Sequence, residues 1–154
     1  MADAWYDIRK LKVTQRAALG LQIVLLVFLF LPVARVTDSS QLMNSVELGV
    51  FYLHHGGILS HIGGVVYCAF SFALPVSIWL VTLLLRSKNR LNYAVSVALC
   101  ALESISSACF YTMVQHRMNA TVALNPLSQI ILILEIVNMF VYIHAYLQSW
   151  QGTN

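Results

Sequence analysis

Charged side chains are scarce in this sequence. Of its 154 residues, 10% are charged and 59% are hydrophobic, whereas an ordinary soluble domain carries roughly 25% charged residues. Nine basic and six acidic side chains could not cover the surface of a water-soluble domain of this size. This shortage excludes a soluble enzyme, and a net charge of only +3 excludes a nucleic-acid-binding face. The composition predicts an integral membrane protein.

Cysteines are also few, and the motifs of common catalytic sites are missing. Cys68, Cys100 and Cys109 all lie in apolar stretches without a C-x-x-C pair, which argues against a disulfide framework or a zinc ribbon. The sequence contains no G-x-S-x-G, H-E-x-x-H or glycine-rich phosphate loop. We therefore expect no enzyme activity, no cofactor, no metal site and no nucleic-acid partner.

Long apolar runs are what the sequence has instead. A bilayer core of about 30 Å requires roughly 20 apolar residues in a helix, and four segments meet this requirement. They are expected at about 17–34, 58–85, 91–114 and 127–147. The predicted fold class is therefore all-α: an integral membrane bundle of four antiparallel helices, which forms a single membrane domain over residues 1–154.

Lysine and arginine gather on one side of this expected bundle. Four precede the first segment and three connect the second to the third, whereas the opposite side has two: Arg9, Lys10, Lys12, Arg16, Arg86, Lys88 and Arg90 against Arg35 and Arg117. Because basic loops tend to stay in the cytoplasm, both termini are predicted to be cytoplasmic.

The connection between the first two segments contains a helix-start pattern. Asn44 precedes Glu47 by three residues, which is the spacing of a capping box, and apolar residues then recur at helical spacing. A short helix is expected at about 44–55. Two interpretations of it remain open: a helix that lies at the non-cytoplasmic membrane interface, and an ordered segment that packs over the mouth of the bundle.

Three histidines follow this expected helix. Imidazole is a common metal ligand, and His54, His55 and His61 are close together in the sequence. However, Gly56-Gly57 interrupts the segment, and no nearby acidic or thiol group other than Glu47 could complete a ligand set. Polar histidines at the interface are therefore favoured over a metal site.

Small residues recur at the start of the second segment. Gly56, Ser60 and Gly64 are spaced four apart, a pattern that lets helix backbones approach closely in lipid. We interpret these residues as a helix-packing face within the chain, with self-association as the alternative.

Two carboxylates lie inside the expected membrane helices. A charged side chain at mid-membrane costs at least about 2.5–3.5 kcal/mol, yet Glu103 and Glu135 occupy the third and fourth segments at depths that differ by about 5 Å. Ser107 shares a helix face with Glu103, and Asn138 and Tyr142 share one with Glu135. The set forms a candidate intramembrane polar site. It would either bind a proton or substrate, or hold the helices together through hydrogen bonds between neutral groups. We favour the second interpretation, because no basic side chain lies at the same depth.

Residues 20–85 share several features with one known family. Leu31-Pro32 closes the first segment, Ser45, Gly49 and Leu53 lie in the following connection, and Leu74-Pro75 lies within the second segment. In these features the chain resembles the membrane module of the paraquat-inducible protein A family. The resemblance implies a four-helix module linked to lipid transport between bacterial membranes. The chain has one module rather than two and lacks the cysteine-rich zinc-binding segment, and the resemblance assigns no functional residue.

Three functions are compatible with these patterns. The leading hypothesis is a non-enzymatic accessory or scaffold subunit of a membrane assembly, whose partners are lipids and either other membrane subunits or a second copy. The main alternative is a transport or lipid-handling module that uses Glu103 and Glu135. The least favoured is a membrane enzyme or metal site at His54, His55 and His61.

Overall fold

The computed structural model describes residues 13–55, 58–85, 89–118 and 120–151. Helices account for most of this part of the chain, and short strands connect some of them. In chain order the elements are α1 (Val13–Phe28), β1 (Pro32–Val36), β2 (Leu42–Asn44), α2 (Ser45–His55), α3 (Ile58–Leu84), α4 (Asn89–Arg117), β3 (Val122–Leu124) and α5 (Pro126–Gln151).

Within the described residues, three helices are long and apolar enough to cross a membrane, namely α3, α4 and α5. They correspond to the segments expected at 58–85, 91–114 and 127–147, so the prediction of helices that are able to span a membrane is confirmed for these three segments. The helix α1 has 16 residues and a length of about 24 Å, which is less than the thickness of a bilayer core.

The expected helix over 17–34 is wrong at its C-terminal end. The helix α1 ends at Phe28, and tight turn hydrogen bonds join Phe30 to Val27 and Leu31 to Phe28. Pro32 follows, and it has no N–H with which to continue a helical ladder. The chain then becomes extended as β1.

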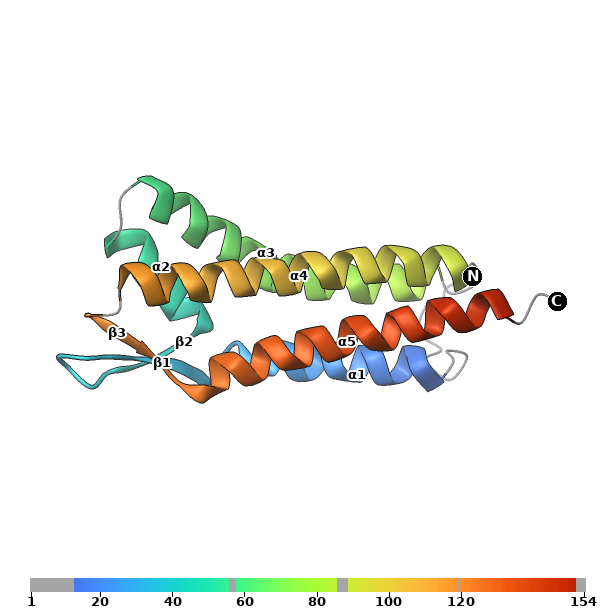
Figure 1. The fold of residues 1–154 in the computed structure, drawn as a ribbon, viewed down its shortest axis with the longest axis horizontal. Coiled ribbons are helices and arrows are strands. Elements are labelled where there is room, and N and C mark those ends of the chain that lie inside the picture. The colour runs from blue at the N-terminus through green and yellow to red at the C-terminus, as the bar shows by residue number, and fades with distance from the viewer. Residues whose placement is uncertain (1–12, 56–57, 86–88, 119, 152–154) are drawn as a thin grey trace, which may run out of the picture.

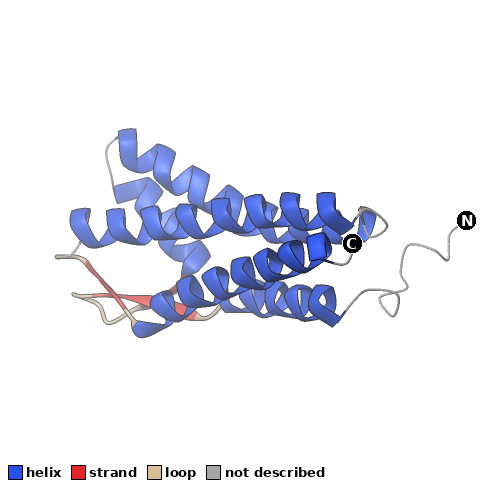
Figure 2. Cartoon of the chain, turned by 45° about the vertical axis from the view of Figure 1, so that its right-hand side comes forward, coloured by secondary structure: helices blue, strands red, loops and turns tan. Residues whose placement is uncertain are grey.

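The strand β1 belongs to a small sheet that the sequence did not predict, within a fold that is otherwise helical as expected. The three short strands form one antiparallel sheet in the order β2-β1-β3. Ala34 of β1 lies opposite Met43 of β2 on one side and opposite Leu124 of β3 on the other. Figure 2 shows the strands together at one end of the helices. We call this the sheet end, and we call the opposite end, where α3 ends and α4 begins, the connection end.

Two helices begin at the sheet end with asparagine caps. Asn44 accepts a hydrogen bond from the backbone N–H of Glu47, and the Glu47 side chain accepts one from the Asn44 backbone N–H, both at 2.9 Å. This reciprocal pair is the capping box expected from the sequence, and it starts α2. Asn125 caps α5 by accepting a hydrogen bond from the N–H of Leu127 at 2.9 Å, with Pro126 as the first helical residue.

The helices α1, α3, α4 and α5 form the helical body. Figure 1 shows α1 beside α5 and α4 beside α3. In this arrangement α1 and α4 each contact both α3 and α5. The short helix α2 packs on α3. Two apolar clusters fill the interior. One lies at the sheet end around Tyr67, Phe110 and Ile131, and the other lies nearer the connection end around Ile78 and Tyr142.

Candidate functional site: a polar interior

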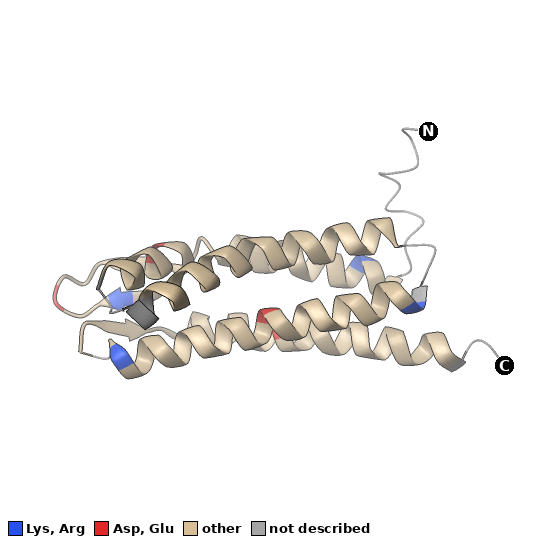
Figure 3. Cartoon of the chain, turned by 90° about the horizontal axis from the view of Figure 1, so that it is seen from above, with Lys and Arg blue, Asp and Glu red and all other residues tan. Residues whose placement is uncertain are grey.

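Polar side chains lie inside the helical body, while large apolar side chains face outward. Glu103, Glu135 and Asn138 are at most 5% exposed, whereas Ile105 and Ile133 are more than half exposed. Figure 3 shows acidic positions in the middle of the helices as well as at the sheet end, whereas the basic positions lie near the ends. Water would not stabilise such an exterior, but the hydrocarbon of a bilayer would.

Glu103 is held by a side chain from α1. The amide nitrogen of Gln22 donates a hydrogen bond to Glu103 Oε2 at 3.1 Å and also lies 4.0 Å from the sulfur of Cys100. Gln22 is 1% exposed. This bond joins α1 to α4, two helices that share few backbone contacts. Gln22 therefore belongs to the candidate site, although the apolar pattern of its segment did not single it out.

Glu135 is held by the residue that the helix-face argument placed beside Glu103. The hydroxyl of Ser107 donates to Glu135 Oε1 at 2.8 Å, which joins α4 to α5. Asn138 lies one turn farther along α5 and donates to the sulfur of Cys100 at 3.7 Å. The structure thus brings Glu103, Ser107, Glu135 and Asn138 into one polar layer between α4 and α5, which we call the carboxyl layer.

A small cavity lies between the two carboxyl groups. Glu103 and Glu135 line it together with Ser71 and Pro75 of α3, and its volume is about 10 Å³. This is close to the smallest space that holds one water molecule. Oε2 of Glu135, Oδ1 of Asn138 and Oε1 of Gln22 are buried without a hydrogen-bond partner among the described residues. Of these three residues, Glu135 lines the cavity.

Tyr142 does not belong to this layer, although it shares the helix face of Glu135. Its hydroxyl lies 2.9 Å from that of Thr82, which also donates to the backbone oxygen of Ile78 at 2.8 Å. The amide of Asn92 donates to the backbone oxygen of Thr82 at 3.0 Å, and Ser96 donates to Asn92 at 3.4 Å. Thr82, Asn92, Ser96 and Tyr142 therefore form a second set, which we call the connection-end network.

An aromatic cluster lies on the other side of the carboxyl layer. The hydroxyls of Tyr67 and Tyr111 are 3.1 Å apart, and Ser45 of α2 lies 3.5 Å from that of Tyr111. The ring of Tyr67 stacks on Phe110 with centroids 3.8 Å apart, and Tyr52 meets Phe110 edge-on at 5.4 Å. These contacts attach α2 to α3 and α4 on the sheet-end side of the carboxyl layer.

The small-residue face can be followed only in part. Gly56 and the side chain of Ser60 lie outside the described residues. A Cβ atom built on Gly64 would lie 3.0 Å from Leu53 Cγ and 3.1 Å from the backbone oxygen of Gly49. Gly64 therefore permits close packing of α3 against α2.

The histidines do not converge on a described site. His54 and His61 are exposed, and the side chain of His55 lies outside the described part of the chain. Among the residues that the structure describes, no group of three or more His, Cys, Asp or Glu side chains could hold a metal ion.

Comparisons with known proteins add no relative. No family model matches the chain, and neither a curated protein nor a solved structure matches it. The resemblance of residues 20–85 to the paraquat-inducible protein A family therefore rests only on the residues that carry it.

Proposed function

We propose that this protein is a non-enzymatic membrane protein that acts as an accessory or scaffold subunit of a larger membrane assembly. One observation carries the proposal: the interior side chains bond to one another across helices. Gln22 bonds to Glu103, and Ser107 bonds to Glu135. The cavity between the carboxyls, about 10 Å³, offers no conduit for a larger substrate. Such an interior fixes the helices in place.

The proposal includes a fourth membrane span. The apolar surface of α1 continues past its last residue, because Phe30 and Leu31 are 63% and 38% exposed. Together with this turn, α1 approaches the length of about 20 residues that a bilayer requires. We propose that the connection end, which carries Arg16 and Arg90, faces the cytoplasm. A reporter fused to the C-terminus that is active only in the cytoplasm tests this orientation.

An outward groove between α3 and α4 supports the partner-binding part of the proposal. It has a volume of about 240 Å³ and an almost wholly apolar lining. Gly63 on α3 and Ser106 and Cys109 on α4 contribute small side chains to it. Small residues at a lipid-facing groove are where a helix of another subunit approaches most closely.

The experiment is purification of the tagged protein from membranes of its own host in a mild detergent, followed by native electrophoresis and mass spectrometry. We expect a defined complex. Cys109→Trp fills the groove and should release the partner subunit, whereas Ile133→Trp, at a more than half-exposed position on α5, should retain it. A stable lone monomer with nothing bound contradicts the proposal, as does a complex that both variants retain equally.

A second candidate function is transport or lipid handling through the carboxyl layer. The unused oxygens of Glu135 and Asn138 favour it, because a carboxylate can receive a proton and both oxygens can accept a hydrogen bond from a small ligand. Glu103→Gln and Glu135→Gln, each reconstituted in vesicles, separate the two functions. Proton flux or movement of labelled lipid that equals the wild-type rate in both variants removes the transport candidate.

A further inference from the structure

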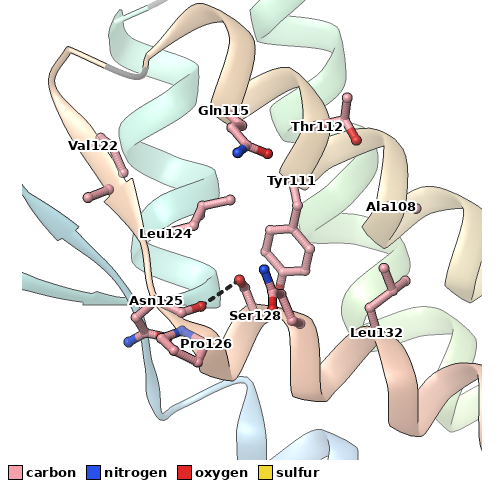
Figure 4. A pocket seen from close by; sticks show the side chains of 12 residues that line it. Ala108, Tyr111, Thr112, Gln115, Val122, Leu124, Asn125, Pro126, Ser128 and Leu132 are labelled. Carbon is pink, nitrogen blue, oxygen red and sulfur yellow. Dashed lines mark hydrogen bonds between the residues drawn. The ribbon is translucent and has the colours of Figure 1, made fainter.

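A second hollow opens outward at the sheet end, between α4, β3 and α5. We call it the sheet-end groove. Its volume is about 520 Å³, which falls within the range of small-ligand sites, about 300–1,000 Å³. Figure 4 shows Thr112 and Gln115 on the α4 side, Leu124 on the strand, and Ser128 and Leu132 on the α5 side. Tyr111 of the aromatic cluster also lines it, whereas Glu103, Glu135 and the connection-end network do not.

The upper lining of the groove contains polar side chains that the fold leaves unused. Asn125 caps α5, and Ser128 donates to the backbone oxygen of Asn125 at 2.8 Å. In contrast, Thr112, Gln115 and Gln129 are exposed, and their side chains make no hydrogen bond to other described residues. Two amides and a hydroxyl are therefore available to a ligand.

The groove extends from the edge of the helical body toward its middle. The helix α4 ends at Arg117, so Thr112 lies about 8 Å and Ala108 about 14 Å below that end. Ala108 and Leu132 make the lower lining apolar, and the ring of buried Tyr111 forms part of the wall. Both α4 and α5 are long and apolar enough to span a membrane, so a bilayer that covers them places the upper lining at headgroup depth and the lower lining in the hydrocarbon. This gradient matches an amphipathic molecule.

The charge of the lining selects among such molecules. Among the described residues, no Asp, Glu, Lys or Arg lines the groove, whereas sites for phosphate are usually built with Arg or Lys. Glutamine offers both donors and an acceptor, which suits the hydroxyl groups of a sugar. We propose that the sheet-end groove binds a lipid with an uncharged, hydroxyl-rich headgroup, of the glycosyl diacylglycerol class. Thr112, Gln115 and Gln129 bond the headgroup, and Ala108 and Leu132 contact the start of an acyl chain.

The test is native mass spectrometry of the full-length protein in detergent. The protein is mixed with equal amounts of monoglucosyl diacylglycerol, phosphatidylglycerol and phosphatidylcholine, and the retained lipid is measured for each. We expect at least a fivefold preference for the glycolipid over the other two. The double variant Gln115→Leu/Gln129→Leu should abolish this preference while the melting temperature of the lipid-free protein stays unchanged.

Two further variants make the test specific to the groove. Gln148→Leu makes the same amide-to-alkyl change at an exposed position near the connection end and should retain the full preference. Ala108→Trp fills the lower groove and should reduce retention of the glycolipid without touching its headgroup ligands. Equal retention of all three lipids, a preference for phosphatidylglycerol, or an unchanged preference in the double variant overturns the proposal. None of these outcomes bears on the scaffold role, which rests on the interior and on the groove between α3 and α4.

Discussion

The helical body contains two buried polar sets that differ in how completely they are bonded. In the connection-end network, Thr82, Asn92 and Tyr142 all have side-chain partners, and none of their polar atoms is left buried without one. In the carboxyl layer, Glu135 and Asn138 each keep one buried oxygen without a partner among the described residues. Burial is similar in the two sets, so the difference lies in their hydrogen bonds.

The difference follows from what each set must satisfy. The helix α3 ends at Leu84, and the last carbonyl groups of any helix lack partners within it. Asn92 provides a donor to the backbone oxygen of Thr82 at 3.0 Å, so the connection-end network completes a helix end. The carboxyl layer lies midway along continuous helices, where the backbone needs no such help. Its side chains are therefore the part of the interior where a role beyond stability can exist.

The largest expected effect on stability comes from removing hydrogen bonds of the connection-end network. Asn92→Leu removes the donor to the Thr82 carbonyl and the acceptor for Ser96. Since each buried group left unsatisfied costs about 1–3 kcal/mol, the free energy of unfolding should fall by about 2–3 kcal/mol. Titration with sodium dodecyl sulfate in mixed micelles measures it. Gln148→Leu is the control: it removes an exposed contact of the amide with His144 one turn away and should change the free energy of unfolding by less than about 0.5 kcal/mol. A loss below about 1 kcal/mol for Asn92→Leu would show that the Thr82 carbonyl and Ser96 do not depend on Asn92 for their hydrogen bonds.

An intermediate effect is expected from the hydroxyl pair in the same network. Tyr142→Phe and Thr82→Val each remove one member of the 2.9 Å contact with little change in shape. Each should lower the free energy of unfolding by about 1 kcal/mol, and the double variant should lose less than the sum, with a coupling of about 0.5–1 kcal/mol. Strictly additive losses in this double-mutant cycle would show that the hydroxyls of Thr82 and Tyr142 do not stabilise each other.

The sequence predicts the long helices well because their signal is local and repeated. Each of α3, α4 and α5 contains more than 20 residues of apolar sequence, and the Asn44–Glu47 spacing marks the start of α2. The sheet could not be predicted in this way. Its strands have three to five residues, too few to establish an alternating pattern. The pairing of Ala34 with Leu124 joins segments about ninety residues apart, so tertiary packing decides it.

The residues of the candidate site could also be predicted from the sequence only in part. Helix geometry puts Asn138 and Tyr142 on the face of Glu135, but Tyr142 lies seven residues along, about 10 Å nearer the connection end, and bonds to Thr82 instead. Residues on the same helix face can therefore lie at different positions along the helix axis. Gln22 was missed because its segment was judged by mean apolarity. The available signal was an amide within an apolar stretch, seven residues after Gln15, which is also buried.

The smallest effect should come from neutralising the carboxyl layer. Glu135→Gln keeps an oxygen that accepts from Ser107, and Glu103→Gln keeps one that accepts from Gln22. If the layer is held by hydrogen bonds between neutral groups, each variant should change the free energy of unfolding by less than about 1 kcal/mol in either direction. Glu47→Gln, which preserves the capping box of α2, is the matched control outside the interior. A loss as large as that of Asn92→Leu would contradict this expectation, because it would mean that the carboxyl layer depends on its acidic groups as strictly as the α3 end depends on Asn92.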